Sequence, residues 1–223
     1  MCSESTADLS DAVLDHSPRS RLVEGLLRAV AVLSYIYMLG GMTVNWWATH
    51  RPWSLMALMV TEGFTLLLIL FAKPAIRRDA SPVMVLAVVY SSAFFLLLEP
   101  QTGIRLISEE VSAAIQVASL FWVLAAKAAI GRAFGILPAA RGLIRRGPYR
   151  VVRHPMYLGY LIGNMAFLAA NASGRNAMVL SALLLVQVLR ILREEEVLKN
   201  SSFGTAYRIY SREVRFRLIP PIF

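Results

Sequence analysis

Two polar stretches in the second half of an otherwise apolar chain hold the residue types that could do chemistry. The first includes residues 147–160, GPYRVVRHPMYLGY, with two prolines, three tyrosines, two arginines and one of the three histidines. The second covers residues 187–223 and contains three consecutive glutamates in the run REEEVL. Arginine, histidine and glutamate form strong hydrogen bonds with charged groups. The two stretches therefore predict a site for a small polar ligand.

The prolines of the first stretch restrict its backbone. Pro148 and Pro155 disfavour regular helix, and each also restricts the residue before it, which keeps Gly147 and His154 extended or turned. Non-helical backbone near a membrane is tolerated only when it is buried in protein or lines a wet cavity. Rigid turns here would present the side chains of Tyr149, Arg153, His154 and Tyr157. The alternative is an ordinary basic loop with tyrosines at the membrane interface.

Helical spacing divides the charges of the second stretch. Gln187, Arg190 and Glu194 recur at i, i+3 and i+7, so they share one helix face. Glu195 lies about 100° further round, because a helix has 3.6 residues per turn. The three glutamates therefore cannot share one partner, and at most two face a bundle interior. The alternative is a solvated helix end stabilised by an Arg190–Glu194 pair.

The rest of the chain predicts an all-α, polytopic membrane helix bundle. Of its 223 residues, 57% are hydrophobic, and the mean hydropathy is +0.57. Spanning a bilayer takes about 20 mostly apolar residues. About six stretches qualify or nearly do: 22–48, 53–72, 82–98, 108–130, 155–171 and 176–192. We expect no strands.

Charge asymmetry predicts the orientation of this bundle. Twenty of the 23 lysines and arginines lie in alternate loops and the two termini, and the other loops hold only Arg51, Arg105 and Arg175. The positive-inside rule then places both termini and residues 147–160 in the cytoplasm. The net charge of +9 fits basic loops on an anionic leaflet better than a nucleic-acid partner. One cysteine and three scattered histidines predict no metal site.

Three segments follow from this layout. Residues 1–20 predict a mobile N-terminal tail, because the first 17 are acidic and hold few large apolar groups. Residues 21–126 predict the N-terminal transmembrane helices on the lipid and substrate side. Residues 127–223 predict the ligand-binding region, with the last two spans and a cytoplasmic tail. Glu62 lies within the second span, and we expect either a functional role or a structural hydrogen bond with its threonine neighbours.

The motifs of the last segment carry a family resemblance. GPYRVVRHPMY, REEEVL, FGTAY and the terminal VRFRLIP, in this order, resemble the integral membrane S-adenosylmethionine methyltransferases. This family includes isoprenylcysteine carboxyl methyltransferase and the phospholipid methyltransferases. The resemblance covers roughly residues 127–223. NADPH-dependent sterol reductases carry something like RHP-x-Y, but the glutamate pair eight to nine residues before Gly204 favours the methyltransferases.

The resemblance implies a cytoplasmic cofactor pocket and roles for individual residues. The stretch that lines the cofactor corresponds to Arg141, Gly142, Leu143 and Ile144. The loop that wraps it corresponds to Tyr149, His154, Pro155, Met156 and Tyr157, and Glu195 corresponds to the acid that contacts it. A substrate arginine of the isoprenylcysteine branch aligns with Ile191, between Arg190 and Arg193, which would orient the methyl acceptor.

The implied function is methyl transfer from S-adenosylmethionine to a lipophilic acceptor, either an isoprenylcysteine-like carboxylate or a lipid head group. The acceptor would be a lipid or a lipidated molecule that enters from the bilayer. Two alternatives remain open: an NADPH-dependent sterol-type reductase, and a non-enzymatic membrane scaffold or transporter. The sequence does not identify the acceptor or the oligomeric state.

Overall fold

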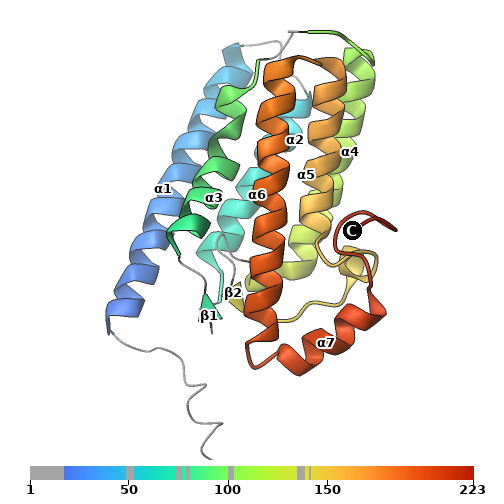
Figure 1. Cartoon of the computed structure of the whole chain (residues 1–223). Helices are drawn as coiled ribbons and strands as arrows, with labels where there is room; N and C mark the ends of the chain where they lie inside the picture. The colour runs from blue at the N-terminus through green and yellow to red at the C-terminus, as the bar shows by residue number, and fades with distance from the viewer. Residues whose placement is uncertain are drawn as a thin grey trace, which may run out of the picture.

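The chain folds into an upright bundle of helices with a short helix lying across one end (Figure 1). The computed structural model describes residues 18–48, 53–73, 77–78, 81–99, 103–134, 139–140 and 142–223. The bundle helices are α1 (Pro18–Ala48), α2 (Trp53–Leu70), α3 (Pro82–Ala93), α4 (Glu109–Ile130), α5 (Pro155–Ala170) and α6 (Gly174–Lys199). Each of the six predicted apolar stretches is therefore helical, and α3 continues into a 3-10 turn over Phe94–Leu97.

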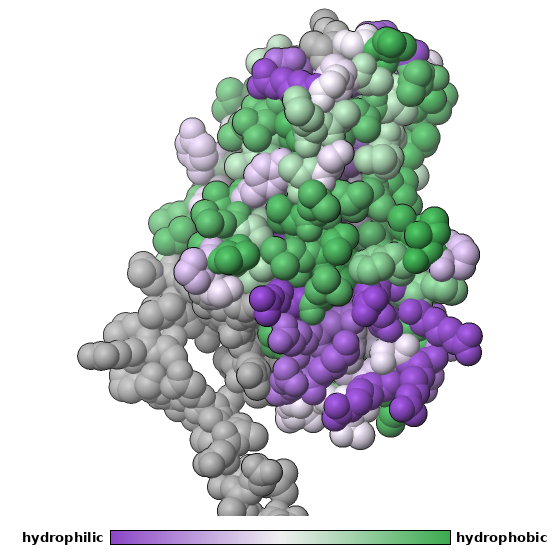
Figure 2. Space-filling view, in the orientation of Figure 1, coloured by the Kyte–Doolittle hydropathy of each residue, from purple (hydrophilic) through white to green (hydrophobic). Residues whose placement is uncertain are grey.

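The surface of the bundle is apolar along most of its length and polar at the end that carries α7 (Gly204–Glu213) (Figure 2). Large apolar side chains such as Leu33, Leu86 and Leu185 are exposed. Among the described residues, three segments are long and apolar enough to cross a membrane: Arg28–Ala48, Glu109–Ala133 and Gly174–Lys199. The other bundle helices are shorter apolar segments, so the number of spans stays a prediction.

Proline and serine define where several helices begin. Pro82 and Pro155 open α3 and α5 at the first turn, where a missing N–H costs no helical hydrogen bond. Ser108 and Ser173 precede α4 and α6, and each side chain accepts a hydrogen bond from a backbone N–H of the first turn. Such caps satisfy N–H groups that a helix leaves unpaired.

Helices α4 and α5 pack closely because α5 presents glycine to α4. A Cβ atom added to Gly159 would lie 2.5 Å from Cγ2 of Val123, and one added to Gly163 would lie 2.7 Å from Oγ of Ser119. The indole of Trp122 donates a hydrogen bond to the Pro155 carbonyl at 2.9 Å. Gly159 and Gly163 therefore allow α5 to approach α4 closely.

One pair of short strands departs from the all-helical expectation. Strand β1 (Arg77–Arg78) pairs antiparallel with β2 (Ala139–Ala140). The pairing ties the connection after α2 to the connection after α4. The prediction of no strands was wrong here, because a two-residue pairing leaves no periodic pattern in the sequence.

The structure describes only part of the predicted N-terminal tail, and it shows how the predicted C-terminal segment returns to the bundle. Residues 1–17 of the predicted tail lie outside the described residues, and residues 18–20 already belong to α1. After α6 the chain turns into α7, and residues 214–223 fold back toward the start of α5 (Figure 1). This return brings together parts of the chain that are about 60 residues apart in sequence.

Candidate functional site

The candidate site lies where three segments meet at the α7 end of the bundle. These are the loop before α5, the last turns of α6, and α7 with the tail that follows it. Backbone hydrogen bonds join the loop to the tail, from the Arg153 N–H to the Phe216 carbonyl at 3.0 Å and from the His154 N–H to the Arg217 carbonyl at 2.9 Å. The tail thus holds the loop in a position from which the side chains of Arg153 and His154 both contact Glu195 of α6.

Glu195 of α6 is the centre of this junction and is only 1% exposed. Its Oε1 lies 3.0 Å from Nε of Arg153 and 3.4 Å from Nε2 of His154. Its Oε2 lies 3.1 Å from Nε of Arg217 and 3.4 Å from Nζ of Lys199. A buried carboxylate needs such partners, because removing a charge from water is costly unless opposite charges replace the solvent.

Tyrosines of the loop and of α7 surround the ionic cluster. Burial, reinforced by the neighbouring Glu195 carboxylate, raises the pKa of the Tyr207 hydroxyl well above its usual value. Burial also raises the pKa of Tyr149, with Glu194 adding to the effect. Burial raises the pKa of Tyr210 to about 12, against an opposing influence of Arg153. All three hydroxyls are therefore neutral near pH 7 and can donate hydrogen bonds.

The tyrosines also link α7 to the loop. The Tyr210 hydroxyl donates a buried hydrogen bond to the Tyr149 carbonyl at 2.7 Å. Tyr149 lies in a 3-10 turn, Gly147–Arg150, whose first residue has a φ of 59°. Glycine adopts this left-handed conformation without steric cost. The turn predicted around Pro148 is confirmed, and it places Tyr149 against α7.

Several buried polar atoms of the cluster are close to opposite charges yet poorly aligned with them. Within the described part of the chain, these atoms make no hydrogen bond of good geometry: Arg153 Nε, His154 Nε2, Glu195 Oε1, Tyr207 Oη and Arg217 Nε. Buried polar groups normally find aligned partners. Several buried donors and acceptors without aligned partners therefore lie close together. A bound polar ligand could supply the hydrogen bonds that they lack.

The three consecutive glutamates occupy three different environments, as their helical spacing predicts. Glu195 is enclosed by the cations described above. Glu194 is partly buried, and its Oε2 lies 3.9 Å from Nδ1 of His154. Glu196 is exposed and lies 2.9 Å from Nη1 of Arg193. Only Glu194 and Glu195 therefore face the junction.

The structure gives the two candidate acceptor arginines of α6 different environments. The Arg190 guanidinium lies over the ring of Tyr157, 5.6 Å from its centroid, inside the bundle. The Arg193 side chain is about half exposed and paired with Glu196. The role predicted for both residues stays a prediction, and the geometry favours Arg190 for it.

The other predicted site residues fall into three groups. His154 and Tyr157 lie beside the glutamates, with their ring centroids 5.9 Å apart. Pro155 is buried as the first residue of α5, and Met156 packs on the apolar cluster that includes Leu68 and Phe134. Gly142, Leu143 and Ile144 form a half-buried irregular segment before the 3-10 turn. Arg141 lies outside the described residues.

Sequence reasoning missed four contacts of this junction. Lys199, Tyr207 and Arg217 were not proposed as site residues, and Arg153 was named only as a side chain of the loop. Tyr207 and Arg217 lie in FGTAY and VRFRLIP, the motifs that carried the resemblance. The signal was therefore present. Their distance to Glu195 depends on the return of the tail, which no local pattern encodes.

A second buried polar group lies within the bundle. Glu62 of α2 pairs with Lys127 of α4 at 3.4 Å, and the Lys127 side chain is 1% exposed. Lys127 is one of the twenty basic residues on the side predicted to be cytoplasmic, and its ammonium is directed into the bundle. It lies in the last turn of α4 and donates to Thr65 Oγ1 at 2.5 Å. Both threonine neighbours of Glu62 therefore contact its cation, Thr61 through its carbonyl and Thr65 through its hydroxyl.

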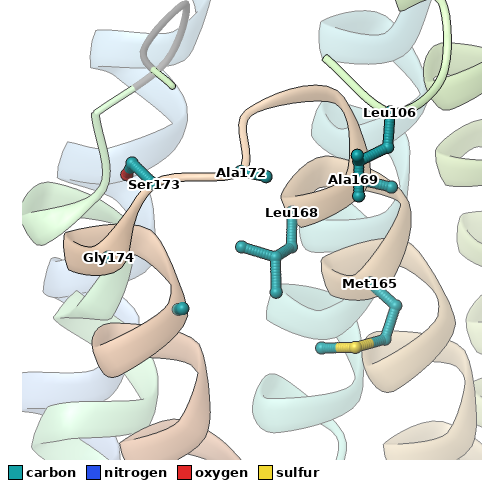
Figure 3. Close-up of a pocket in the computed structure, with 8 residues that line it drawn as sticks. Leu106, Met165, Leu168, Ala169, Ala172, Ser173 and Gly174 are labelled. Carbon is teal, nitrogen blue, oxygen red and sulfur yellow. The ribbon is translucent and has the colours of Figure 1, made fainter. Parts of the chain in front are cut away.

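A shallow apolar hollow of about 440 Å³ lies between α5 and α6 at the opposite end of the bundle (Figure 3). Leu168, Met165 and Ala172 are among its lining residues, none of which is charged. It therefore lacks the groups that would hold a charged cofactor. Among the described residues, no His, Cys, Asp or Glu cluster could hold a metal ion.

The fold and the junction define a helical membrane protein with a buried, charged site at one end of the bundle. A family model described as phospholipid methyltransferase matches residues 103–206, from just before α4 into α7. The match agrees with the resemblance found in the sequence and supports a membrane methyltransferase. The match contains His154, Tyr157 and Glu195 and ends before Arg217. No curated protein matches the chain.

Proposed function

We propose that the chain is an integral membrane methyltransferase that moves a methyl group from S-adenosylmethionine to a lipophilic acceptor. The observation that carries the proposal is the buried cluster around Glu195, with its unaligned polar atoms. Arg153, His154 and Glu195 of this cluster lie within the segment that matches the methyltransferase family, and Tyr207 and Arg217 lie after it. A cluster of this kind is unusual in an apolar bundle, because buried ionisable groups are costly and mark functional sites by default.

The side chains at the junction match the charges of the cofactor. S-adenosylmethionine has a carboxylate, which Arg153 and His154 can bind, and an ammonium group, which suits Glu194 or Glu195. Glu194 is partly exposed, whereas Glu195 is already enclosed by cations. We therefore assign the ammonium contact to Glu194 first and assign Glu195 to holding the loop and the tail in place. Neutral Tyr149 and Tyr157 remain available for the adenosine.

When bound, the cofactor supplies an electrophilic methyl group on its sulfonium. The protein then has to hold the acceptor in line with this methyl group and to exclude water. Such positioning accelerates the reaction because the reacting groups no longer have to find the correct geometry by diffusion. The loop and the returning tail, joined through Arg153 and His154, would close the site from the aqueous side. The reaction needs no protein nucleophile; a carboxylate acceptor needs no base, whereas a protonated amine acceptor has to release one proton to a base when it is methylated.

The acceptor reaches the site from the bilayer in this proposal. Arg190, inside the bundle on Tyr157, would orient either an isoprenylcysteine-like carboxylate or the phosphate of a lipid head group. Arg193 is the less suitable of the two because its partner is the exposed Glu196. The cytoplasm would supply the soluble cofactor, in keeping with the charge distribution of the loops.

The test is to incubate membranes that contain the protein with methyl-labelled S-adenosylmethionine and to separate lipids from proteins. We expect label in a lipid or lipidated fraction, and less than a tenth of it with a His154→Ala variant expressed at the same level. Label in neither fraction would contradict the proposal. Tight NADPH binding without transfer would instead support the sterol-type reductase.

A further inference from the structure

The strongest feature that the cofactor site leaves unexplained is the Glu62–Lys127 pair, together with the residues around it. The ammonium of Lys127 donates to Thr65 Oγ1 at 2.5 Å, to the Thr61 carbonyl at 3.4 Å and to Glu62 Oε1 at 3.4 Å. An ammonium has three N–H donors. All three N–H donors of Lys127 thus have acceptors within the protein, and its side chain is 1% exposed.

Glu62 differs from its partner in two respects. Its side chain is 13% exposed, and a carboxylate accepts more hydrogen bonds than Lys127 supplies, since its two oxygens offer about four acceptor positions. Lys127 therefore fixes the orientation of the Glu62 carboxylate, which retains the capacity to accept a further donor.

The polar side chains continue from Glu62 to the cofactor site. The Lys127 ammonium lies over the ring of Tyr160 of α5, 5.7 Å from its centroid. Three residues earlier on α5, Tyr157 lies under the Arg190 guanidinium, which is 5.6 Å from the ring centroid, and beside the ring of His154. Side chains from α2, α4, α5 and α6 therefore extend polar contacts from Glu62 toward the cofactor site inside an apolar bundle.

We propose that Glu62 binds the methyl acceptor, receiving a hydrogen bond from a positively charged or N–H-bearing group of its head, and that Lys127 is its positioning residue. This proposal rests on the proposed function and deepens it. In a low-dielectric interior an ionised carboxylate attracts such a group and repels another carboxylate. Glu62 would therefore select acceptors with an amine head over acceptors with a carboxylate head.

A purely structural role for the pair makes a different prediction, and a double variant separates the two. Removing either charge alone leaves the other buried without a partner, whereas replacing both with uncharged side chains is often neutral for stability. The Glu62→Gln/Lys127→Met protein should therefore fold as stably as the original chain. A structural role predicts that methyl transfer also returns, and acceptor binding predicts that it stays lost.

The experiment uses the full-length protein in detergent, with Glu62→Gln, the double variant, and Glu99→Gln as a matched control. Glu99 is exposed and paired with Arg175 at the opposite end of the bundle. Two readouts are taken: S-adenosylhomocysteine affinity by calorimetry, and transfer from labelled S-adenosylmethionine to two probes. The probes are phosphatidylethanolamine, with an amine head, and N-acetyl-S-farnesylcysteine, with a carboxylate head.

We expect transfer to the amine probe by the original chain and by Glu99→Gln. We expect Glu62→Gln and the double variant to raise the acceptor KM or lower transfer about 10- to 100-fold, as the loss of a charge-assisted hydrogen bond implies. Their S-adenosylhomocysteine affinity should stay within about twofold. Unchanged transfer in the double variant, or preference for the carboxylate probe, would overturn the inference alone. A chain that binds no S-adenosylhomocysteine and methylates neither probe would overturn the proposed function as well.

Discussion

The run Glu194–Glu195–Glu196 divides three like charges among three environments within one turn of helix. Glu195 is enclosed by cations, Glu194 faces His154 and Tyr157, and Glu196 pairs with an exposed arginine. The same residue type therefore has a different energetic role at each position. A buried carboxylate holds neighbouring cations in place, whereas an exposed pair contributes little.

This difference gives a direct stability prediction. Glu195→Gln leaves the buried Arg153 and the partly exposed Arg217 without a full counter-charge, so we expect a loss of about 3–5 kcal/mol in the free energy of unfolding. Glu196→Gln, one residue further on, should cost less than about 1 kcal/mol because its pair is exposed. Thermal unfolding of the two purified variants measures the contrast, and equal shifts would contradict the assigned roles.

The buried tyrosines predict how stability changes at alkaline pH. The folded state raises the pKa of Tyr207, so above about pH 10 the unfolded chain releases this proton while the folded chain keeps it. Stability must then fall as the pH rises, by about 1.4 kcal/mol per pH unit for one such group. In Tyr207→Phe, thermal unfolding between pH 10 and 12 should show a shallower decline. A decline as steep as in the original chain would show that folding does not raise the pKa of Tyr207.

Sequence reasoning found the residues of the site more readily than their neighbours. The loop that holds His154 and Tyr157 could be predicted because proline punctuation acts locally, and Glu195 was assigned from the family resemblance. Arg217 could not be placed beside Glu195, because the contact depends on a tail that pairs its backbone with residues 153–154. The inward direction of Lys127 could not be predicted either, because a cation at a helix end turns inward only where another helix supplies acceptors.

At the scale of the elements, the contact between α4 and α5 depends on glycine. Gly159 faces Val123 and Trp122 so closely that an added methyl group would need one of them to move. This packing fixes the position of the first turn of α5, and therefore of His154, along the axis of α4. The six helices could be predicted from apolar stretches and their breaks, but the β1–β2 pair and the course of the tail could not.

We predict that Gly159→Ala destabilises the protein by about 1–3 kcal/mol through overpacking. Gly63→Ala in α2 is the matched control, because a Cβ atom there meets nothing within 4 Å and alanine favours helix. The two variants are compared by thermal unfolding in the same detergent. A Gly159→Ala protein as stable as Gly63→Ala would mean that the helices are further apart than described.

At the scale of the whole molecule, the polar α7 end and the apolar body suggest one direction of insertion (Figure 2). A chain with both termini and the site in the cytoplasm would take its cofactor from water and its acceptor from the bilayer. The basic residues gathered at the α7 end agree with this orientation under the positive-inside rule.

Cysteine labelling tests the orientation. In a Cys2→Ser background, Ile104→Cys and Ser202→Cys place single thiols at exposed positions at opposite ends of the bundle. An impermeant thiol reagent should label position 104 in intact cells and position 202 only after the membrane is opened. The reverse pattern would place the site on the other side of the membrane.

The most direct test of the central claim is calorimetric titration of the purified protein with S-adenosylhomocysteine and, separately, with NADPH. The account predicts one S-adenosylhomocysteine site per chain, no NADPH binding, and affinity at least tenfold weaker in His154→Ala, since a hydrogen bond to a charged group is worth about 1.5–3 kcal/mol. Arg193→Ala, on the exposed face of α6, should bind as the original chain does. Binding of NADPH but not of S-adenosylhomocysteine would contradict the account.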